Sequence, residues 1–433
     1  LLDTLRGQRN NMPITHSPIS KVIDEHADFA MLELSIHTHT LHTKHSEALR
    51  NSYTEMLLSG CGTYNRHTFL DALGNLGSLI AISDEGNTIH VQLRARNETL
   101  EKTLTLLACI FEKPRFEPQE LKRIQKHLIE ELKLAREDAS TRARQHFTNA
   151  LLDVNDYRYA YELDTVRHEV EKVSRKEILS LHDTVMHHGV AYGAIGGTSR
   201  ACTRIEKILT RLFPLVQNAT RSTAFPVLNP TGRTVTLIDI PHKQNIEFSL
   251  GGTVPFLYTD TDFPSLFFGL CVLGIQGGFS GRLMSIVREK EGLTYGIYAN
   301  AEGITALNQG FWRISTFFAP KDAVQGVTST LREIERIQKK GITEDELSRF
   351  KQILETRFAL IEDSLMKRVR EQYKIAATGT TPEIFHAFKK DIAHLTRARV
   401  NAALKKYLDP LRMIISGAGP IQTVKEQLQK FSR

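Results

Sequence analysis

The stretch from Gly277 to Tyr295, GGFSGRLMSIVREKEGLTY, is the part of the sequence from which the fold can best be inferred. Paired glycines free the backbone at its start, and a serine follows that can cap a helix. Leu283, Ile286 and Val287 then recur at the spacing of one helix face. A charged turn ends in a glycine, which suits a helix C-terminus. Tyr295 then enters a predicted strand that alternates Leu293, Tyr295 and Ile297. The stretch therefore predicts a hinge, a helix, a turn and a strand start.

This stretch resembles the signature of the C-terminal half of M16-type (pitrilysin-like) zinc peptidase subunits. In that family an arginine and a tyrosine reach across a chamber and hold the substrate backbone at the zinc site. They match Arg288 and Tyr295 here, so the resemblance implies that these two residues bind substrate. Peptide hydrolysis places negative charge on the scissile carbonyl oxygen, and a cation and a phenol directed at that oxygen stabilise the transition state. The resemblance covers nearly the whole chain and implies a subunit of the M16B type.

The N-terminal half lacks the zinc motif of the family. Catalytic halves carry His-x-x-Glu-His on a helix, where two histidines bind zinc and the glutamate activates a water molecule. Placed by the Met-Leu and Gly that follow it, the motif puts Asn51 and Glu55 at the histidine positions and Thr54 at the base. Glu131 matches the family's distant glutamate ligand, but one carboxylate does not hold zinc. The resemblance therefore implies no zinc and no catalytic residue in this chain, and zinc in a partner subunit.

Four histidines, His37, His39, His42 and His45, precede this degenerate motif. His37 and His39 share one face if the segment around them is a strand, because side chains repeat every second residue. A histidine-rich surface strand is the favoured interpretation. A replacement metal site is the alternative, and a carboxylate held near the cluster would support it.

The two halves of the chain resemble each other. Residues 116–128 align with residues 342–354, and both segments read as helix starts in which the same four residues recur. Residues 214–233 are rich in Asn, Ser, Thr, Pro and Gly, which is typical of a linker. We therefore expect two similar domains, 1–213 with the degenerate zinc site and 234–433 with the Arg/Tyr motif. The family implies an α+β fold, M16/LuxS-like, in which each domain is a largely antiparallel sheet with helices on one face.

The composition excludes several classes of protein. The 433 residues carry a net charge of +7, with basic residues scattered among acidic ones, so nucleic-acid binding is not expected. The longest apolar run, 266–275, is about half the ~20 residues of a membrane span. The four cysteines show no metal-ligand spacing, and Cys109 and Cys271 fit small buried apolar residues. We expect a soluble protein, and bacterial periplasm and cytoplasm both stay open.

The sequence thus favours a non-catalytic, substrate-binding subunit of a heterodimeric M16B zinc metallopeptidase that cleaves unfolded peptides. Its partner would carry the zinc motif, and Arg288 and Tyr295 would complete the partner's active site. The alternative is a structural or scaffolding protein that kept the fold and lost peptidase work, like the family's core subunits in respiratory complexes. A third interpretation is a metal-dependent enzyme that uses the histidines from His37 to His45.

Overall fold

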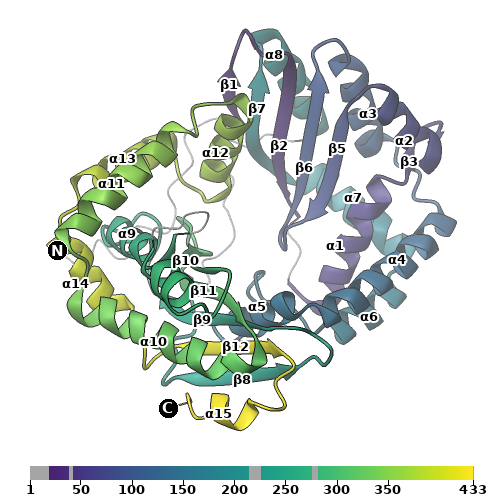
Figure 1. Ribbon diagram of the computed structural model, residues 1–433. Coiled ribbons are helices and arrows are strands. Elements are labelled where there is room, and N and C mark those ends of the chain that lie inside the picture. Colours follow the sequence, from purple (N-terminus) through teal and green to yellow (C-terminus); the bar gives the residue numbers. More distant parts are fainter. Residues whose placement is uncertain (1–18, 39–41, 214–225, 276–280, 433) are drawn as a thin grey trace, which may run out of the picture. The chain divides into compact units, whose positions relative to one another are not determined.

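A computed structural model of the chain describes residues 19–38, 42–213, 226–275 and 281–432 (Figure 1). The chain forms two compact units, and each unit is assembled from three segments. The first unit comprises Leu1–Glu131, Asp164–Thr223 and Leu360–Pro382, and the second comprises Leu132–Leu163, Ala224–Ala359 and Glu383–Arg433. Each unit is built around its own five-stranded sheet.

The sheet of the first unit has the strand order β1-β7-β2-β6-β5. β1 runs parallel to β7, and the other neighbouring strands are antiparallel. Side chains alternate between the two faces of a strand, so Leu32, Leu34 and Ile36 of β2 share one buried face. The strands are β1 (Ile19–Ile23), β2 (Phe29–His37), β5 (Leu79–Asp84), β6 (Thr88–Arg96) and β7 (Val190–Gly197), and β3 (Gly60–Cys61) and β4 (Tyr64–Asn65) form a separate hairpin.

The sheet of the second unit repeats this topology strand for strand. Its order from the opposite edge is β8-β12-β9-β11-β10, with β8 parallel to β12 and all other neighbours antiparallel. Strands β2 and β9 have nine residues each, as do β6 and β11. The prediction of an α+β fold with two similar, largely antiparallel sheets is confirmed. The strands are β8 (Thr234–Asp239), β9 (Ile246–Val254), β10 (Ile297–Glu302), β11 (Gly310–Phe318) and β12 (Ile414–Gly419).

Each unit takes one helix from the other half of the sequence. Helix α12 (Leu365–Ala377) packs on β7, β1 and β2 of the first sheet, and helix α5 (Ala139–Asn149) packs on β12 and β9 of the second. Gly196 allows this approach, because a Cβ there would lie 2.2 Å from a methyl carbon of Val369 on α12. The ranges 1–213 and 234–433 assign both helices to the opposite units. The expected linker lies largely in 214–225, outside the described residues.

Helices cover both faces of the first sheet. Helix α8 (Ser199–Leu212) lies over the face that carries Ala30, since a Cβ at Gly197 would be 3.2 Å from Ala30 and 3.4 Å from Ala201. Helix α12 contacts the face that carries the next residue, Met31. Successive residues point to opposite faces, so the exchanged helix covers part of the side that the family resemblance left open.

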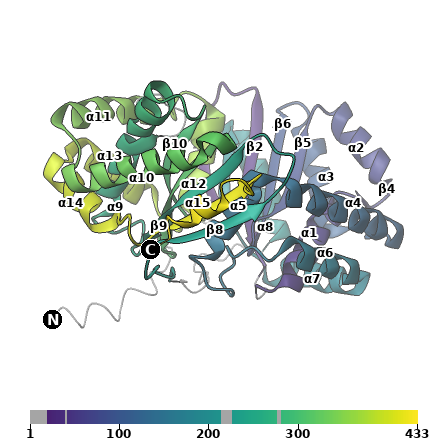
Figure 2. The ribbon, with the colours of Figure 1, turned by 60° about the horizontal axis from the view of Figure 1, so that its bottom comes forward.

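The remaining helices surround the two sheets. Helix α1 begins with a capping box between Thr43 and Ser46, and α7 begins with one between Ser174 and Glu177, so local sequence fixes both starts. Figure 2 shows α15 along β8 of the second unit. No helix among the described residues is long and apolar enough to cross a membrane. The bounds are α1 (Lys44–Leu57), α2 (Arg66–Asn75), α3 (Leu100–Glu112), α4 (Pro118–Glu137), α6 (Leu163–Lys172), α7 (Arg175–His188), α9 (Phe263–Gly274), η1 (Met284–Lys290), η2 (Pro320–Asp322), α10 (Ala323–Lys340), α11 (Glu344–Ala359), α13 (Pro382–His394), α14 (Arg397–Tyr407) and α15 (Lys425–Gln429).

Candidate functional site

The segment that carries Arg288 is a π-helix, η1, in place of the expected α-helix. The wide turn shows in a backbone bond that spans five residues, from the amide of Glu291 to the carbonyl of Ile286 (2.9 Å). Gly292 then takes φ +67°, a left-handed conformation that favours glycine at a helix end. Single-turn π-helices recur at functional sites. The predicted hinge and capping serine lie in residues 276–280, outside the described part of the chain.

Tyr295 lies outside the strand that the sequence predicted for it. β10 begins at Ile297, and Leu293 and Ile297 are buried while Tyr295 is 82% exposed. A turn at Thr294 causes the difference, since the amide of Gly296 donates to the Thr294 hydroxyl oxygen (3.2 Å). The prediction that residues 293, 295 and 297 alternate along one strand is therefore wrong. The turn directs the phenol of Tyr295 into solvent, an unusual placement for so large a ring.

Arg288 and Tyr295 line the same pocket of the second unit, a concavity of about 700 Å³. Phe317 of β11 adds an aromatic wall, and Thr294 adds a hydroxyl. The pocket thus combines a cation, a phenol and an aromatic surface, a set that suits a peptide backbone and its side chain. The full lining is Asn245, Arg288, Glu289, Gly292, Leu293, Thr294, Tyr295, Phe317, Ala319 and Asp322.

An ion pair fixes the start of the segment. The guanidinium of Arg282 donates through Nε to Oε1 of Glu346 (2.7 Å) and through Nη2 to Oε2 (2.6 Å), and Nη2 also reaches the carbonyl of Gly341 (2.8 Å). Both side chains are nearly buried, at 13% and 14% exposed. Burial opposes ionisation of Glu346, but the bonds from Arg282 and Thr343 outweigh it and lower the pKa of the carboxyl. A bidentate pair of this kind holds its helix firmly.

A second ion pair fixes the end of the segment. Glu291 follows the last residue of η1 and accepts from Arg332 of α10. Burial works against ionisation of Glu291, but the Ser329 hydroxyl and Arg332 outweigh it, so the pKa of the carboxyl is lowered. Arg288 lies between these two attachment points. Its backbone is therefore positioned by contacts with α10 and α11, two helices on the same unit.

The degenerate zinc positions lie on α1 of the first unit and carry no ligand set. Thr54 is 3% exposed and its hydroxyl donates to the carbonyl of Asn51 (3.0 Å), which satisfies it within the helix. Glu131 lies on α4, and Oε1 of its exposed carboxylate is 3.2 Å from Nε2 of His127 one turn away. No group of three His, Cys, Asp or Glu side chains that could hold a metal ion occurs within residues 19–38, 42–213, 226–275 and 281–432.

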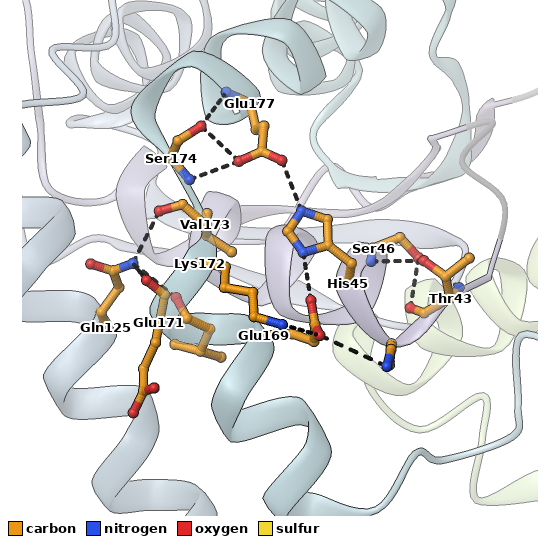
Figure 3. Close-up of polar contacts among 12 residues, drawn as sticks. Thr43, His45, Ser46, Gln125, Glu169, Glu171, Lys172, Val173, Ser174 and Glu177 are labelled. Carbon is orange, nitrogen blue, oxygen red and sulfur yellow. Dashed lines mark hydrogen bonds and ion pairs between the residues drawn. The ribbon is translucent and has the colours of Figure 1, made fainter.

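His45 joins α1 to α6 and α7 (Figure 3). Its Nδ1 lies 3.0 Å from a carboxylate oxygen of Glu169, and its Nε2 lies 2.8 Å from one of Glu177. Burial opposes protonation of the ring, but these two bonds raise the pKa of His45 above its ordinary value. Carboxylates do lie near the histidine cluster, yet they occupy both ring nitrogens from opposite sides. His45 thus pairs with two carboxylates, Glu169 and Glu177. His39 lies outside the described residues.

Polar side chains also gather under α12 in the first unit. Glu33 of β2 is 2% exposed, accepts from Gln92 (2.9 Å) and lies 3.0 Å from Nε2 of His90. Burial opposes ionisation of Glu33, but these contacts lower the pKa of the carboxyl overall. The ring of Tyr373 stacks on His90 at 4.8 Å, and its hydroxyl lies 2.8 Å from that of Ser35. The stacking of Tyr373 on His90 and its hydroxyl contact with Ser35 hold α12 on the sheet.

Comparison with solved structures shows which proteins share this fold. The fold is shared with a crystal structure described as the peptidase M16 inactive domain from Pseudomonas fluorescens, at a TM-score of 0.79 and 19% identity over 95% of this chain and 98% of that one. A protease from Helicobacter pylori gives 0.76 and 13% identity over 92% and 96%. A chain of Complex III2 from Candida albicans gives 0.70 and 15% over 95% and 96%. These likenesses establish the fold that this chain shares with the three proteins.

Comparison with family models identifies the family of the chain. Residues 24–163 match the model "Insulinase (Peptidase family M16)", and residues 172–354 match "Peptidase M16 inactive domain". The chain belongs to the peptidase M16 family, and its C-terminal region is of the inactive type. No curated protein matches the sequence.

Sequence reasoning missed the residues that position the site. In the sequence, Arg282 is one charge among several on the predicted helix, and Glu346 is one acidic residue at a helix start. Their pairing joins positions far apart in the chain, and no local pattern reports such a contact. The one available signal is that Glu346 occupies a position that recurs between the two halves, where its counterpart Glu120 pairs with Arg123 on its own helix (2.8 Å).

Proposed function

We propose that this chain is the non-catalytic, substrate-binding subunit of a heterodimeric M16B zinc metallopeptidase that cleaves unfolded peptides. The observation that carries the proposal is the shared pocket of Arg288 and Tyr295, with the Tyr295 ring 82% exposed beside it. An aromatic side chain that lines a pocket and is largely exposed suits contact with another molecule. The match to the inactive-domain model supports the assignment of chemistry to a second chain.

The two residues suit the chemistry of amide cleavage. The Tyr295 hydroxyl donates one hydrogen bond, and the Arg288 guanidinium adds donors with a permanent positive charge. Directed at the scissile carbonyl oxygen, both interact more strongly with the developing oxyanion than with the neutral amide. Zinc bound by the partner subunit would activate the attacking water. This chain's contribution is to orient the peptide and to stabilise the charge.

Reconstitution tests this proposal. The chain is purified from its native host with whatever it binds, and the bound chain is identified by mass spectrometry. We expect a zinc-bearing M16 subunit, peptide hydrolysis by the reconstituted pair, and none by either chain alone. Hydrolysis by this chain alone, or a partner whose activity is the same with and without it, would show that the proposed division of labour is wrong.

A scaffolding function is the second candidate, and one observation favours it. The fold is shared at a TM-score of 0.70 with a chain of Complex III2 from Candida albicans. A scaffold needs the duplicated fold but no exposed Tyr295. Co-purification separates the two candidates, because a scaffold would come with an assembly that contains no zinc-bearing M16 chain.

A metal-dependent enzyme built on His37, His39, His42 and His45 has less support. Both ring nitrogens of His45 already contact carboxylates. Metal analysis of the purified chain tests this candidate directly. Stoichiometric zinc that is lost in a His37→Ala variant would establish it against the substrate-binding proposal.

A further inference from the structure

Cys61 and Cys109 lie on neighbouring segments of the first unit, although they are distant in the sequence. Cys61 belongs to β3, which follows α1, and Cys109 lies in the last turn of α3. Beside the effect of burial, the neighbouring Cys109 side chain raises the pKa of the Cys61 thiol. A Cβ added to the neighbouring Gly62 would lie 3.0 Å from the sulfur of Cys109, which independently places that sulfur against the β3 backbone.

Backbone bonds hold the two cysteines together. The amide of Gly62 donates to the carbonyl of Lys113 (2.8 Å), and that of Arg115 donates to the carbonyl of Gly60 (3.2 Å). Cys61 itself forms a β-bridge with Pro114. The residues on either side of Cys61 are thus bonded to the segment that leaves α3. The close approach of the two cysteine positions therefore rests on a fixed backbone arrangement.

The other two cysteines have no such partner thiol. Cys202 is buried, and its sulfur contacts the carbonyl of Gly197 at 3.7 Å. Cys271 is buried in the apolar core of the second unit. Cys61 is fully buried, and burial and the contact with Cys109 raise the pKa of its thiol. Cys109 is partly exposed, so an oxidant in solution reaches Cys109 first.

We propose that Cys61 and Cys109 are a redox-sensitive pair that closes to a disulfide when the chain meets a low-molecular-weight disulfide such as oxidised glutathione. The Cys109 thiolate attacks one sulfur of the oxidant, forming a mixed disulfide and releasing one reduced thiol. The Cys61 thiolate then attacks the Cys109 sulfur, displacing the second small thiol. Two protein thiols are oxidised and one small disulfide is reduced to two thiols, so electrons and protons balance.

The bond has a defined structural effect. It would link β3 covalently to α3 and close the loop from Cys61 to Cys109, which contains α2, β5 and β6. A disulfide across a loop of this length restricts the unfolded chain and stabilises the folded one. The linked hairpin directly follows α1, the helix that carries the degenerate zinc positions. The redox state would therefore affect the first unit and leave the second unit without a new constraint.

The experiment uses the full chain and mixtures of reduced and oxidised glutathione. After equilibration, free thiols are alkylated in urea and peptides are mapped by mass spectrometry without reduction. We expect the four free cysteines to fall to two, with one cross-linked peptide joining Cys61 to Cys109, reversible by dithiothreitol. The Cys61→Ala variant should carry glutathione on Cys109 alone, and Cys202→Ala should still form the bond.

Three results would overturn the proposal. They are four free thiols in fully oxidised glutathione, a disulfide that involves Cys202 or Cys271, and no glutathione on Cys109 in the Cys61→Ala variant. The last result would show that the oxidant does not reach Cys109. All of them are read from peptide masses, so none depends on the proposed peptidase function.

Discussion

The two units share one strand order but differ in the side chains beside their edge strands. Gly60 and Leu76 match Gly277 and Leu293 at an offset of 217 residues. At this offset the counterparts of Arg288 and Tyr295 in the first unit are Asp71 and Ser78. Asp71 is exposed and pairs with a histidine on its own helix at 3.2 Å, and the Ser78 hydroxyl contacts that of Thr103 at 2.7 Å. The duplication therefore preserved the backbone and not the chemistry. In the second unit, by contrast, a cation and a phenol line the same pocket.

The degenerate zinc positions of the first unit also differ in chemistry from their counterparts in the second. The degenerate zinc positions Asn51 and Thr54 of α1 align with Phe268 and Cys271 of α9. Phe268 and Cys271 lie in the core of the second unit, at 0% and 5% exposed. The first unit thus keeps polar residues where a metal site would stand, and the second fills the same positions with apolar side chains. The two units thus share one strand order but carry different side chains at aligned positions.

The largest effect on folding is expected at Arg50, which holds the edge strand of the first unit. Its Nε donates to Asp84 at the end of β5 (2.9 Å), with the side chains 1% and 6% exposed. Arg50→Met leaves Asp84 buried without its cation, which costs about 3–5 kcal/mol of unfolding free energy. Burial already raises the pKa of Asp84 to about 6, so the deficit should be larger at pH 8 than at pH 5.

Urea unfolding followed by circular dichroism measures this loss, and hydrogen exchange of peptides from α1 and β5 localises it. The matched control is Arg96→Met, since Arg96 forms an exposed pair of the kind that contributes about 0–1 kcal/mol. If both variants unfold at the same urea concentration as the parent, Arg50 does not hold β5 to α1.

An intermediate effect is expected in the second unit for Glu346→Gln. The change removes the charge that pairs with Arg282, and a hydrogen bond to a charged group contributes about 1.5–3 kcal/mol. The pKa of Glu346 is lowered, so its contribution is present above the ordinary carboxyl pKa and is lost as pH falls through the lowered value. Trp312, the single tryptophan, is buried on β11 and reports unfolding of this unit by fluorescence.

Glu344→Gln is the control for Glu346→Gln, because Glu344 lies on the same helix in an exposed pair with Arg397 (3.0 Å). We expect its fluorescence transition to match the parent's closely. If both variants lose the same unfolding free energy, the pair with Arg282 stabilises the unit no more than an exposed pair does.

The sequence anticipated the general fold better than the packing. Helical spacing shows which face of a helix is buried, as in α12, but not against which sheet that face packs. The exchange of α5 and α12 was therefore not foreseen. The strand pattern correctly marked Leu293 and Ile297 as buried. The turn at Thr294 depends on a hydrogen bond to its side chain, which hydrophobic periodicity does not show.

The smallest effect is a pH dependence at His45. Its pKa is raised in the folded chain, so its contribution is complete below the unfolded value of about 6.5 and is lost as pH rises through the folded value. The side chain is 35% exposed, and solvent screening keeps the contribution under about 1 kcal/mol. His45→Gln should lower the unfolding free energy at pH 5.5 more than at pH 8.5. A deficit that is identical at both pH values would rule out a charged His45.

The most direct test of the account is the turnover of the reconstituted heterodimer carrying Tyr295→Phe. The change removes only the hydroxyl, and loss of one donor to a developing oxyanion typically slows turnover by about 10²–10³. Tyr298→Phe is the control, since Tyr298 follows closely on β10 but does not line the pocket. We predict slow turnover for Tyr295→Phe, the parent rate for Tyr298→Phe, and normal heterodimers by size and melting temperature for both. A Tyr295→Phe heterodimer that assembles and cleaves peptide at the parent rate would contradict the claim that this chain completes the active site.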